Sequence, residues 1–129
     1  KAFFPGGASG GILPASLAHL PLDFGVFEEY GGFIGSHAIV VLSEKDSIKE
    51  AALNTMRFFK HESCGQCTPC RSGTDKMIRL LENDISEINL YNDLIKVMGD
   101  SSICGLGQAA ANCVSHLIKY FPKEFLNEP

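Results

Sequence analysis

The chain has 129 residues, of which 45% are apolar and 20% charged, a balance typical of one ordinary globular domain or of a small module joined to a larger one. Its 11 basic and 15 acidic residues give a formal net charge of −4, so electrostatics offers no support for binding nucleic acid or an anionic membrane. The longest uninterrupted apolar stretch, Ala38 to Leu42, is far too short to cross a bilayer. We therefore expect no nucleic-acid partner and no direct membrane insertion.

The sequence starts at Lys1, without a methionine, in what reads as a folded region. We therefore expect a piece of a longer protein whose upstream part is missing. No signal peptide is visible, and five cysteines cannot all pair with one another in disulfides. These features favour the reducing cytoplasm, either free or at the periphery of a membrane complex.

Charge is distributed unevenly along the chain. Residues 1–43 hold four charged residues and 8 of the 13 glycines, whereas residues 44–129 hold the other 22 charges and all five cysteines. This shift predicts a domain boundary near Ser43. Residues 1–43 begin with Phe3-Phe4 and close with the β-branched run Ala38 to Leu42, which predicts a small β-rich module of short strands between Gly and Pro turns.

The glycine-rich run from Gly6 to Gly11 invites comparison with phosphate-binding loops. Those motifs need a set glycine spacing between a strand and a helix. Ile12-Leu13-Pro14 follows here and does not suit the start of such a helix. We interpret the run as a turn of the β module.

Residues 44–129 predict four short helices around one core. Ser47 opens a capping box before the first helix, and Thr68 is the expected N-cap of the second, with Pro69 at its first position. Gly99 is expected to end the third helix and Pro122 the fourth. The apolar stripes of the four helices are, in order, Ile48, Ala52, Met56 and Phe59; Met77, Leu80 and Leu81; Ile88, Tyr91, Leu94, Ile95 and Met98; and Ala110, Cys113, Leu117 and Phe121.

Three cysteines, Cys64, Cys67 and Cys70, stand at two-residue gaps, and Cys104 follows much farther along the chain. A cubane cluster has four irons that each need one thiolate, so one tight loop can wrap three corners while a remote cysteine closes the fourth. Zinc also accepts four thiolates, but structural zinc sites usually come as two separate C-x2-C pairs. We therefore predict a 4Fe–4S cluster, with a zinc-stabilised four-cysteine interaction module without redox function as the alternative.

The residues around the cysteines fit this prediction. Gly65, Gly105 and Gly107 would let the backbone approach the inorganic sulfurs and donate N–H bonds. Cys70 would fall in the first turn of a helix, where the dipole favours a thiolate. Arg71 is either a positive charge close to the anionic cluster or an ordinary surface arginine. Because iron would take all four thiols, we expect no catalytic residue and interpret the site as an electron relay.

Other candidate groups have plainer interpretations. Cys113 lies on an apolar stripe and is expected in the core rather than as a fifth ligand. His61 precedes the cysteine loop and is expected to be a solvated residue at a helix end. His19, His37 and His116 show no ligand spacing with one another.

The run Glu62-Ser-Cys-Gly-Gln-Cys-Thr-Pro-Cys-Arg71 closely resembles the NADH-binding flavoprotein subunit of respiratory complex I and its relatives. These include β subunits of NAD-linked formate dehydrogenases and diaphorase subunits of NAD-linked hydrogenases. The resemblance covers nearly the whole chain. It implies an α+β architecture in which residues 1–43 are the end of a soluble-ligand-binding β-grasp (SLBB) segment and residues 44–129 a four-helix 4Fe–4S domain.

The resemblance also implies cofactors and partners. In this family the four matching cysteines hold a 4Fe–4S cluster that accepts electrons from flavin mononucleotide (FMN) reduced by NADH. The flavin and nucleotide sites belong to an upstream domain of the same subunit, so this chain is expected to bind neither FMN nor NAD. The implied partners are that upstream domain, a small thioredoxin-like 2Fe–2S subunit and a large cluster-bearing catalytic subunit.

Two further runs are relevant to the branch of the family. Ile103-Cys-Gly-Leu-Gly-Gln-Ala-Ala110 and Ile118-Lys-Tyr-Phe-Pro122 resemble the formate dehydrogenase and hydrogenase branch more than the complex I subunit. That branch often continues with prolines after the paired alanines, whereas Ala111-Asn112-Cys113 stands here. Despite this difference, the two runs favour a subunit of an NAD-linked formate dehydrogenase or hydrogenase over complex I.

Overall fold

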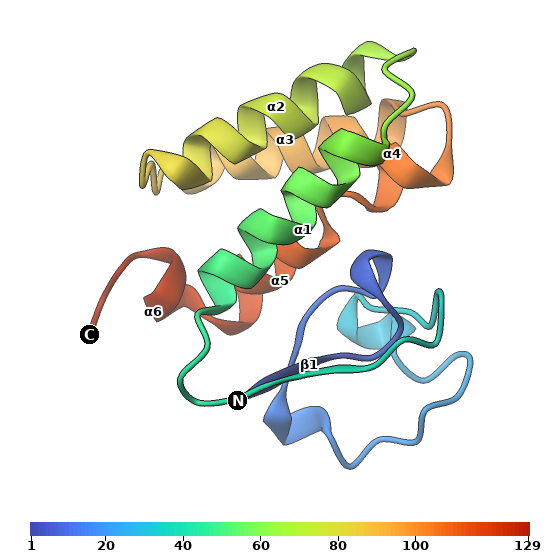
Figure 1. Cartoon of the computed structure of the whole chain (residues 1–129), viewed down its shortest axis with the longest axis vertical. Coiled ribbons are helices and arrows are strands. Elements are labelled where there is room, and N and C mark those ends of the chain that lie inside the picture. Colours follow the sequence, from blue (N-terminus) through green and yellow to red (C-terminus); the bar gives the residue numbers. More distant parts are fainter.

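The computed structural model describes residues 1–129, with a small sheet at one end of the molecule and a group of helices above it (Figure 1). The sheet has the strand order β2-β1-β3, and both outer strands run antiparallel to β1. Phe3 of the central strand pairs with Leu13 on one side and with Val41 on the other. The strands are β1 (Ala2–Phe4), β2 (Leu13–Pro14) and β3 (Val40–Leu42).

Between the strands the chain forms turns and three single-turn 3₁₀ helices. The glycine-rich run contains one of them, η1 (Ala8–Gly10), flanked by Gly7 and Gly11 at φ values of 82° and 84°. Such positive φ angles favour glycine, and strand β2 follows η1 instead of a helix. The interpretation of the run as a turn is therefore confirmed. The other two 3₁₀ helices are η2 (Ala15–Leu17) and η3 (Glu28–Tyr30).

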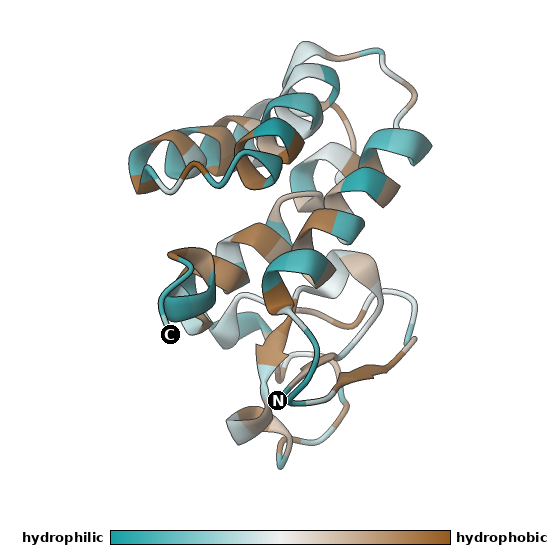
Figure 2. Ribbon diagram, turned by 60° about the vertical axis from the view of Figure 1, so that its left-hand side comes forward, coloured by the Kyte–Doolittle hydropathy of each residue, from teal (hydrophilic) through white to brown (hydrophobic).

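Six helices follow, and most of the chain's regular structure lies in them. They are α1 (Ile48–Glu62), α2 (Thr68–Glu82), α3 (Ile88–Ser101), α4 (Gly105–Ala109), α5 (Asn112–Tyr120) and α6 (Pro122–Phe125). Helix α1 packs against α2 and α5, α2 also packs against α3, and α3 packs against α4. Figure 2 shows hydrophilic and hydrophobic residues alternating along the longer helices, which is typical of amphipathic helices with one buried face.

The start of α1 agrees with the sequence. Ser47 is the N-cap, and its hydroxyl accepts a hydrogen bond from the backbone N–H of Glu50 at 3.1 Å. The Glu124 carboxylate on α6 accepts a second bond, from the N–H of Ile48, at 2.7 Å. Two of the free N–H groups at this helix end are thus satisfied, one of them by a residue from the far end of the chain.

The structure has six helices instead of the predicted four, because the two short helices α4 and α6 were not predicted. Helix α4 has five residues and α6 has four, too few to show a helical period in the sequence. The fourth predicted stripe is divided between elements, since Ala110 caps the end of α4 and Phe121 lies outside α5. Helix α5 does end directly before Pro122, as predicted, with Phe121 as its C-cap; Pro122 also begins α6, since a proline is tolerated in the first turn of a helix.

Two predicted helix ends also differ from the structure. The N-cap of α2 is Cys67 rather than Thr68, which is the first helical residue and makes no capping bond through its side chain. Helix α3 runs past Gly99 to Ser101, since Gly99 keeps a helical conformation and the N–H of Ser102 closes the last turn on the carbonyl of Met98.

One hydrophobic core joins residues from both sides of Ser43. Ala2, Phe4 and Ile12 belong to the same buried cluster as the inner faces of the helices. A second, smaller cluster lies wholly in the first part of the chain and contains Phe3, Leu13, Phe27 and Ile34. The expected combination of a small sheet with mostly helical structure is therefore confirmed at this coarse level.

Three side chains of helix α5 make polar contacts that attach the first part of the chain to the helices. The Asn112 side chain donates to the carbonyl of Ser9 at 2.8 Å, and the Tyr120 hydroxyl donates to the carbonyl of Tyr30 at 2.7 Å. Cys113 is fully buried between them, and its thiol donates to the carbonyl of Ala8 at 3.3 Å. Burial raises the pKa of this thiol to about 12. Its predicted place in the core is confirmed.

His116, also on α5, is wedged between two glycines. A Cβ atom at Gly11 would lie 2.3 Å from its ring, and one at Gly31 would lie 2.9 Å from it. The side chain is 3% exposed, and its Nδ1 atom has no hydrogen-bond partner. Burial lowers the pKa of this imidazole below its usual value, so the neutral form is the one that fits.

We expect His116 to make stability depend on pH. An unfolded histidine takes up a proton near pH 6.5, whereas the buried one stays neutral to a lower pH. The unfolded state therefore binds more protons below about pH 6.5, and the free energy of unfolding should fall there by up to about 1.4 kcal/mol per pH unit, with no such loss above. Urea titrations between pH 5 and 8 should show that the free energy of unfolding falls less steeply with decreasing pH in His116→Gln than in the wild type. His61→Gln, at an exposed site, should keep the wild-type slope; equal slopes in all three proteins would contradict this account.

None of the helices combines the length and the apolar character needed to cross a membrane.

Candidate metal centre

The four predicted ligands meet at one end of the helical part. Cys64 and Cys67 lie in the connection between α1 and α2, Cys70 lies in the first turn of α2, and Cys104 is the N-cap of α4. Figure 1 shows the α1–α2 connection and the chain leading into α4 at this same end. All four line a single cavity of about 220 Å³. The other lining residues are Glu62, Ser63, Gln66, Ile103 and Leu106.

Local backbone conformation explains why three cysteines face one cavity. Ser63 leaves α1 in an extended conformation, and Gly65 then turns the chain with a φ of 72°, which a residue with a side chain rarely adopts. Cys67 is extended again as the N-cap of α2, and Pro69 stands in the first turn of that helix. A tight loop and a helix start therefore present three thiols within seven residues.

The thiols differ in exposure. Cys70 is buried at 5% exposure and Cys67 is half-buried, whereas Cys64 and Cys104 are exposed. Ile103, beside Cys104, is 74% exposed although it is apolar. The cavity therefore has an inner wall of protein at Cys70 and an outer side close to the surface of this chain.

Backbone N–H groups favour the thiolate form of a cysteine in this cavity. The pKa of Cys67 is lowered, chiefly by the backbone N–H of Ile103 and next by that of Cys70. Desolvation opposes this shift without cancelling it. The two donors come from different parts of the chain, so folding itself stabilises the charged form that ligates metal.

Arg71 holds the cysteine loop directly. Its Nη1 atom donates to the carbonyl of Gly65 at 2.6 Å and to that of Gln66 at 3.3 Å. Nη2 lies 3.4 Å from the Thr68 hydroxyl. The guanidinium is exposed and fixes the turn between the first two cysteines; its action on a cluster stays a prediction.

The three glycines that were expected to let the backbone approach the cluster have different surroundings. Gly65 supplies the turn at positive φ, and a Cβ there would meet nothing within 4 Å. Gly107 is needed for packing, because a Cβ would lie 2.5 Å from the Ser102 hydroxyl and 2.9 Å from the Cβ of Cys70. A Cβ at Gly105 would meet no atom. Their contact with a cluster stays a prediction.

Sequence reasoning missed two serines at this site. The Ser63 hydroxyl lies 3.2 Å from Cys70 Sγ, and the Ser102 hydroxyl is buried beside Gly107 with no hydrogen-bond partner. Each serine stands one or two positions before a cysteine, but nothing in the sequence shows which side chains turn inward. A buried hydroxyl without a partner is rare in proteins. At this position it fits a cavity that takes a group with hydrogen-bond acceptors.

The arrangement of the thiols also fits a cluster. They come from two distant segments and line one cavity, three of them from one tight run. A cubane takes one thiolate at each of its four corners, whereas structural zinc sites usually come as two separate C-x2-C pairs. The residues present therefore suit a 4Fe–4S cluster.

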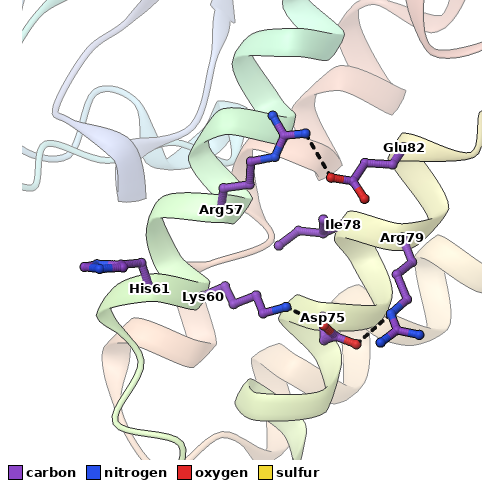
Figure 3. Close-up of a pocket in the computed structure, with 7 residues that line it drawn as sticks. All are labelled: Arg57, Lys60, His61, Asp75, Ile78, Arg79 and Glu82. Atoms are coloured by element: carbon purple, nitrogen blue, oxygen red, sulfur yellow. Dashed lines mark hydrogen bonds and ion pairs between the residues drawn. The ribbon is translucent and has the colours of Figure 1, made fainter.

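A larger pocket of about 550 Å³ runs between α1 and α2 but has no comparable chemistry (Figure 3). Its charged side chains pair with one another: Arg57 pairs with Glu82 at 2.9 Å, and Asp75 pairs with both Lys60 and Arg79. Figure 3 shows the exposed ring of His61 turned away from Asp75, in agreement with its predicted solvated position. The Arg57–Glu82 and Lys60–Asp75 pairs join the two helices, and the Arg79–Asp75 pair lies within α2.

Comparison with known families shows to which family the chain belongs. The sequence model of the NADH-ubiquinone oxidoreductase-F iron-sulfur binding region matches residues 50–128, a range that contains all four cavity cysteines. The chain belongs to this family. The predicted resemblance is thereby confirmed, and the 4Fe–4S cluster is the cofactor that this family region implies.

Curated relatives of this family extend the similarity to the first part of the chain. The F subunit of NADH-quinone oxidoreductase in Rickettsia rickettsii (strain Sheila Smith) is 38% identical over 130 residues, which cover 96% of this chain and 31% of the relative. The corresponding F subunit of Rhodobacter capsulatus is 37% identical over 131 residues, covering 96% and 30%. The chain thus spans about a third of the length of these relatives.

Solved structures of two states of an NAD+-reducing [NiFe]-hydrogenase have the same fold. The H2-reduced state matches with a TM-score of 0.83 and 29% identity over 98% of this chain and 22% of the hydrogenase chain. The air-oxidised state matches with a TM-score of 0.82 and 30% identity, covering 98% and 23%. These hydrogenase chains therefore contain the arrangement of sheet and helices described above.

Proposed function

We propose that Cys64, Cys67, Cys70 and Cys104 hold one 4Fe–4S cluster that relays single electrons within a larger NAD(H)-dependent oxidoreductase. The observation that carries this proposal is the meeting of these four thiols, from two distant segments, around one cavity. The lowered pKa of Cys67 and the Arg71 bonds to the loop support it. When bound, the cluster stores one electron at a time.

The residues of the chain have separate tasks in this relay. The four thiolates occupy every iron corner, which leaves no open position for a substrate and limits the site to electron transfer. The N-terminus of α2 and the Arg71 guanidinium supply positive potential beside the thiolates, which stabilises added negative charge. The exposed side at Cys64 and Cys104 offers a short route for an electron to a neighbouring redox centre.

The rest of the assembly is part of the same proposal. Electrons would come from FMN in an upstream domain, after its reduction by NADH, or pass in the reverse direction. They would continue to a thioredoxin-like 2Fe–2S subunit and a large cluster-bearing subunit. The names of the relatives, which are subunits of NADH-quinone oxidoreductases and an NAD+-reducing hydrogenase, support membership in such a complex. A cytoplasmic location, at the periphery of a membrane complex or free, completes the proposal.

Two finer assignments follow the resemblance. Residues 1–43 would be the end of an SLBB β-grasp segment, separated near Ser43 from the cluster domain, and the three-stranded sheet and the charge shift support this division. The branch would be that of formate dehydrogenases or hydrogenases. Similarity to a hydrogenase structure supports the hydrogenase branch. The sequence relatives are subunits of NADH-quinone oxidoreductases, so they give the formate dehydrogenase branch no particular support.

Transfer of electrons from free reduced FMN tests the relay. The full chain, loaded anaerobically with iron and sulfide, should accept one electron per chain, so that one reduced FMN reduces two chains and releases two protons. Loss of the cluster's visible absorbance on mixing measures the transfer. A colourless protein with one zinc would establish the alternative zinc module. A cluster that is bound but takes no electron would contradict the relay, and an upstream sequence without a flavin domain would favour a stand-alone ferredoxin-like carrier.

A further inference from the structure

Ser63 makes two hydrogen bonds at the edge of the cysteine cavity. Its Oγ atom lies 3.1 Å from the backbone nitrogen of Gly65 and 3.2 Å from Cys70 Sγ. The backbone N–H of Gly65 can only donate, so the Ser63 oxygen accepts that bond. This leaves the Ser63 hydrogen free for another partner.

The direction of the bond between Ser63 and Cys70 follows from ligation. A cysteine that binds iron is a thiolate and has no hydrogen to donate. The hydroxyl of Ser63 must therefore donate to Cys70 Sγ. Because Cys70 is the buried ligand, at 5% exposure, little water competes for its sulfur, and a hydrogen bond there has a larger electrostatic effect than one at the surface.

Ser102 gives a second buried hydroxyl, which lies behind the residues that line the cavity. It is 6% exposed, its Oγ atom has no hydrogen-bond partner, and it lies next to the Gly107 backbone that packs on Cys70. A Cβ atom at Gly107 would lie 2.5 Å from this hydroxyl and 2.9 Å from the Cβ of Cys70, so the Ser102 hydroxyl stands on the same side of the site as the buried ligand.

We propose that the Ser63 and Ser102 hydroxyls donate hydrogen bonds to the sulfur atoms of the bound cluster and thereby raise its reduction potential. This inference rests on the proposed cluster at the four cysteines. Ser63 acts on the Cys70 thiolate, and the unpartnered Ser102 hydroxyl acts from the same buried side of the site. Both are positioning residues, because they act on the electron-accepting group through hydrogen bonds and bind no iron themselves.

The expected effect follows from charge. Reduction adds one negative charge to a cluster that is already anionic, so a hydrogen bond to its sulfur is stronger in the reduced form than in the oxidised form. Removing the Ser63 hydroxyl should lower the equilibrium constant for reduction about three- to tenfold. At 59 mV per tenfold for one electron, this is a decrease of about 30–60 mV in midpoint potential.

A redox titration of the full, cluster-loaded chain followed by electron paramagnetic resonance measures this potential. Ser63→Ala and Ser102→Ala should each have a lower midpoint potential, while Ser63→Thr, which keeps the hydroxyl, should stay near the wild type. Ser72→Ala and Ser101→Ala are the matched controls, because both serines are exposed on α2 and α3 and lie outside the cavity lining. Both controls should keep the wild-type potential.

The outcomes separate this inference from the proposed function. A wild-type chain that takes up no iron contradicts the cluster itself. A loaded Ser63→Ala variant with the wild-type potential overturns the role of Ser63, and the same result in Ser102→Ala overturns that of Ser102. Should Ser63→Ala lose the cluster, retention by Ser63→Thr would still support the hydroxyl bond, whereas equal loss in both would show that Ser63 serves packing only and would overturn the inference.

Discussion

Replacing Cys104 with serine is expected to abolish the native cluster. Cys104 is the only one of the four proposed ligands that comes from the second segment, so no neighbouring cysteine could take its corner of the cube. The serine hydroxyl resists deprotonation at neutral pH and is a much poorer ligand for iron than a thiolate. The loss should exceed the roughly 10–100-fold fall in metal affinity that is typical when a group that only supports a ligand is removed. Iron content and visible absorbance measure it.

Cys113→Ser is the matched control for this variant. It makes the same chemical change at a buried cysteine that bonds to the carbonyl of Ala8 and lies outside the cavity lining. The cluster should survive there, even if stability falls. An undisturbed spectrum in Cys104→Ser, or an equal loss of cluster in both variants, would count heavily against the ligand role of Cys104.

Adding one methyl group at Gly107 is the second change with a large expected effect. The new Cβ of Gly107→Ala would lie 2.5 Å from the Ser102 hydroxyl, 2.6 Å from its Cβ and 2.9 Å from the Cβ of Cys70. Overpacking of this kind usually lowers the free energy of unfolding by about 1–3 kcal/mol. Since the clash falls on Cys70 itself, we expect cluster occupancy to fall together with stability. Urea denaturation and iron content measure the two effects.

Gly105→Ala separates this clash from helix propensity. Both glycines belong to α4, so both substitutions gain a similar preference for the helix, about 1 kcal/mol or less. A Cβ at Gly105 meets no atom, so this variant should be as stable as the wild type or slightly more stable, with full cluster content. Equal behaviour of the two variants would show that close packing of α4 on Cys70 is not required.

Much of the site could be predicted from the sequence because cysteine spacing is a strong local signal. The four cysteines and the place of Cys70 in a first helical turn needed no tertiary information. The same is true of Cys113 in the core, since apolar periodicity alone places it on a buried face. What these cases share is that a pattern within one segment determines the result.

Other features depended on contacts between distant segments. The buried hydroxyl of Ser102 and the need for glycine at position 107 both arise where α4 packs on the start of α2. The contact between Ser63 and Cys70 spans only seven residues but depends on how the α1–α2 connection turns. His116 gave no sequence signal, because its importance comes from two glycines that lie far from it in the chain. Only the assembled fold brings such groups together.

The number of helices predicted from the sequence was wrong for a related reason. Helices α4 and α6 are shorter than two full turns, so they show no period and owe their stability to tertiary packing rather than to intrinsic helix propensity. Gly99 was expected to end α3 because glycine often does so, yet packing of α3 against α2 and α5 carries the helix two residues further. Tertiary contacts overrode local preference at each of these points.

The most direct test of the central claim is the electron paramagnetic resonance spectrum of the anaerobically reconstituted, dithionite-reduced chain, recorded with its iron and sulfide content. Four thiolates around one cavity predict about four irons and four sulfides per chain, and one paramagnetic cluster on reduction by one electron. A chain that takes up no iron, or that instead binds one zinc and gives no signal, would contradict the account.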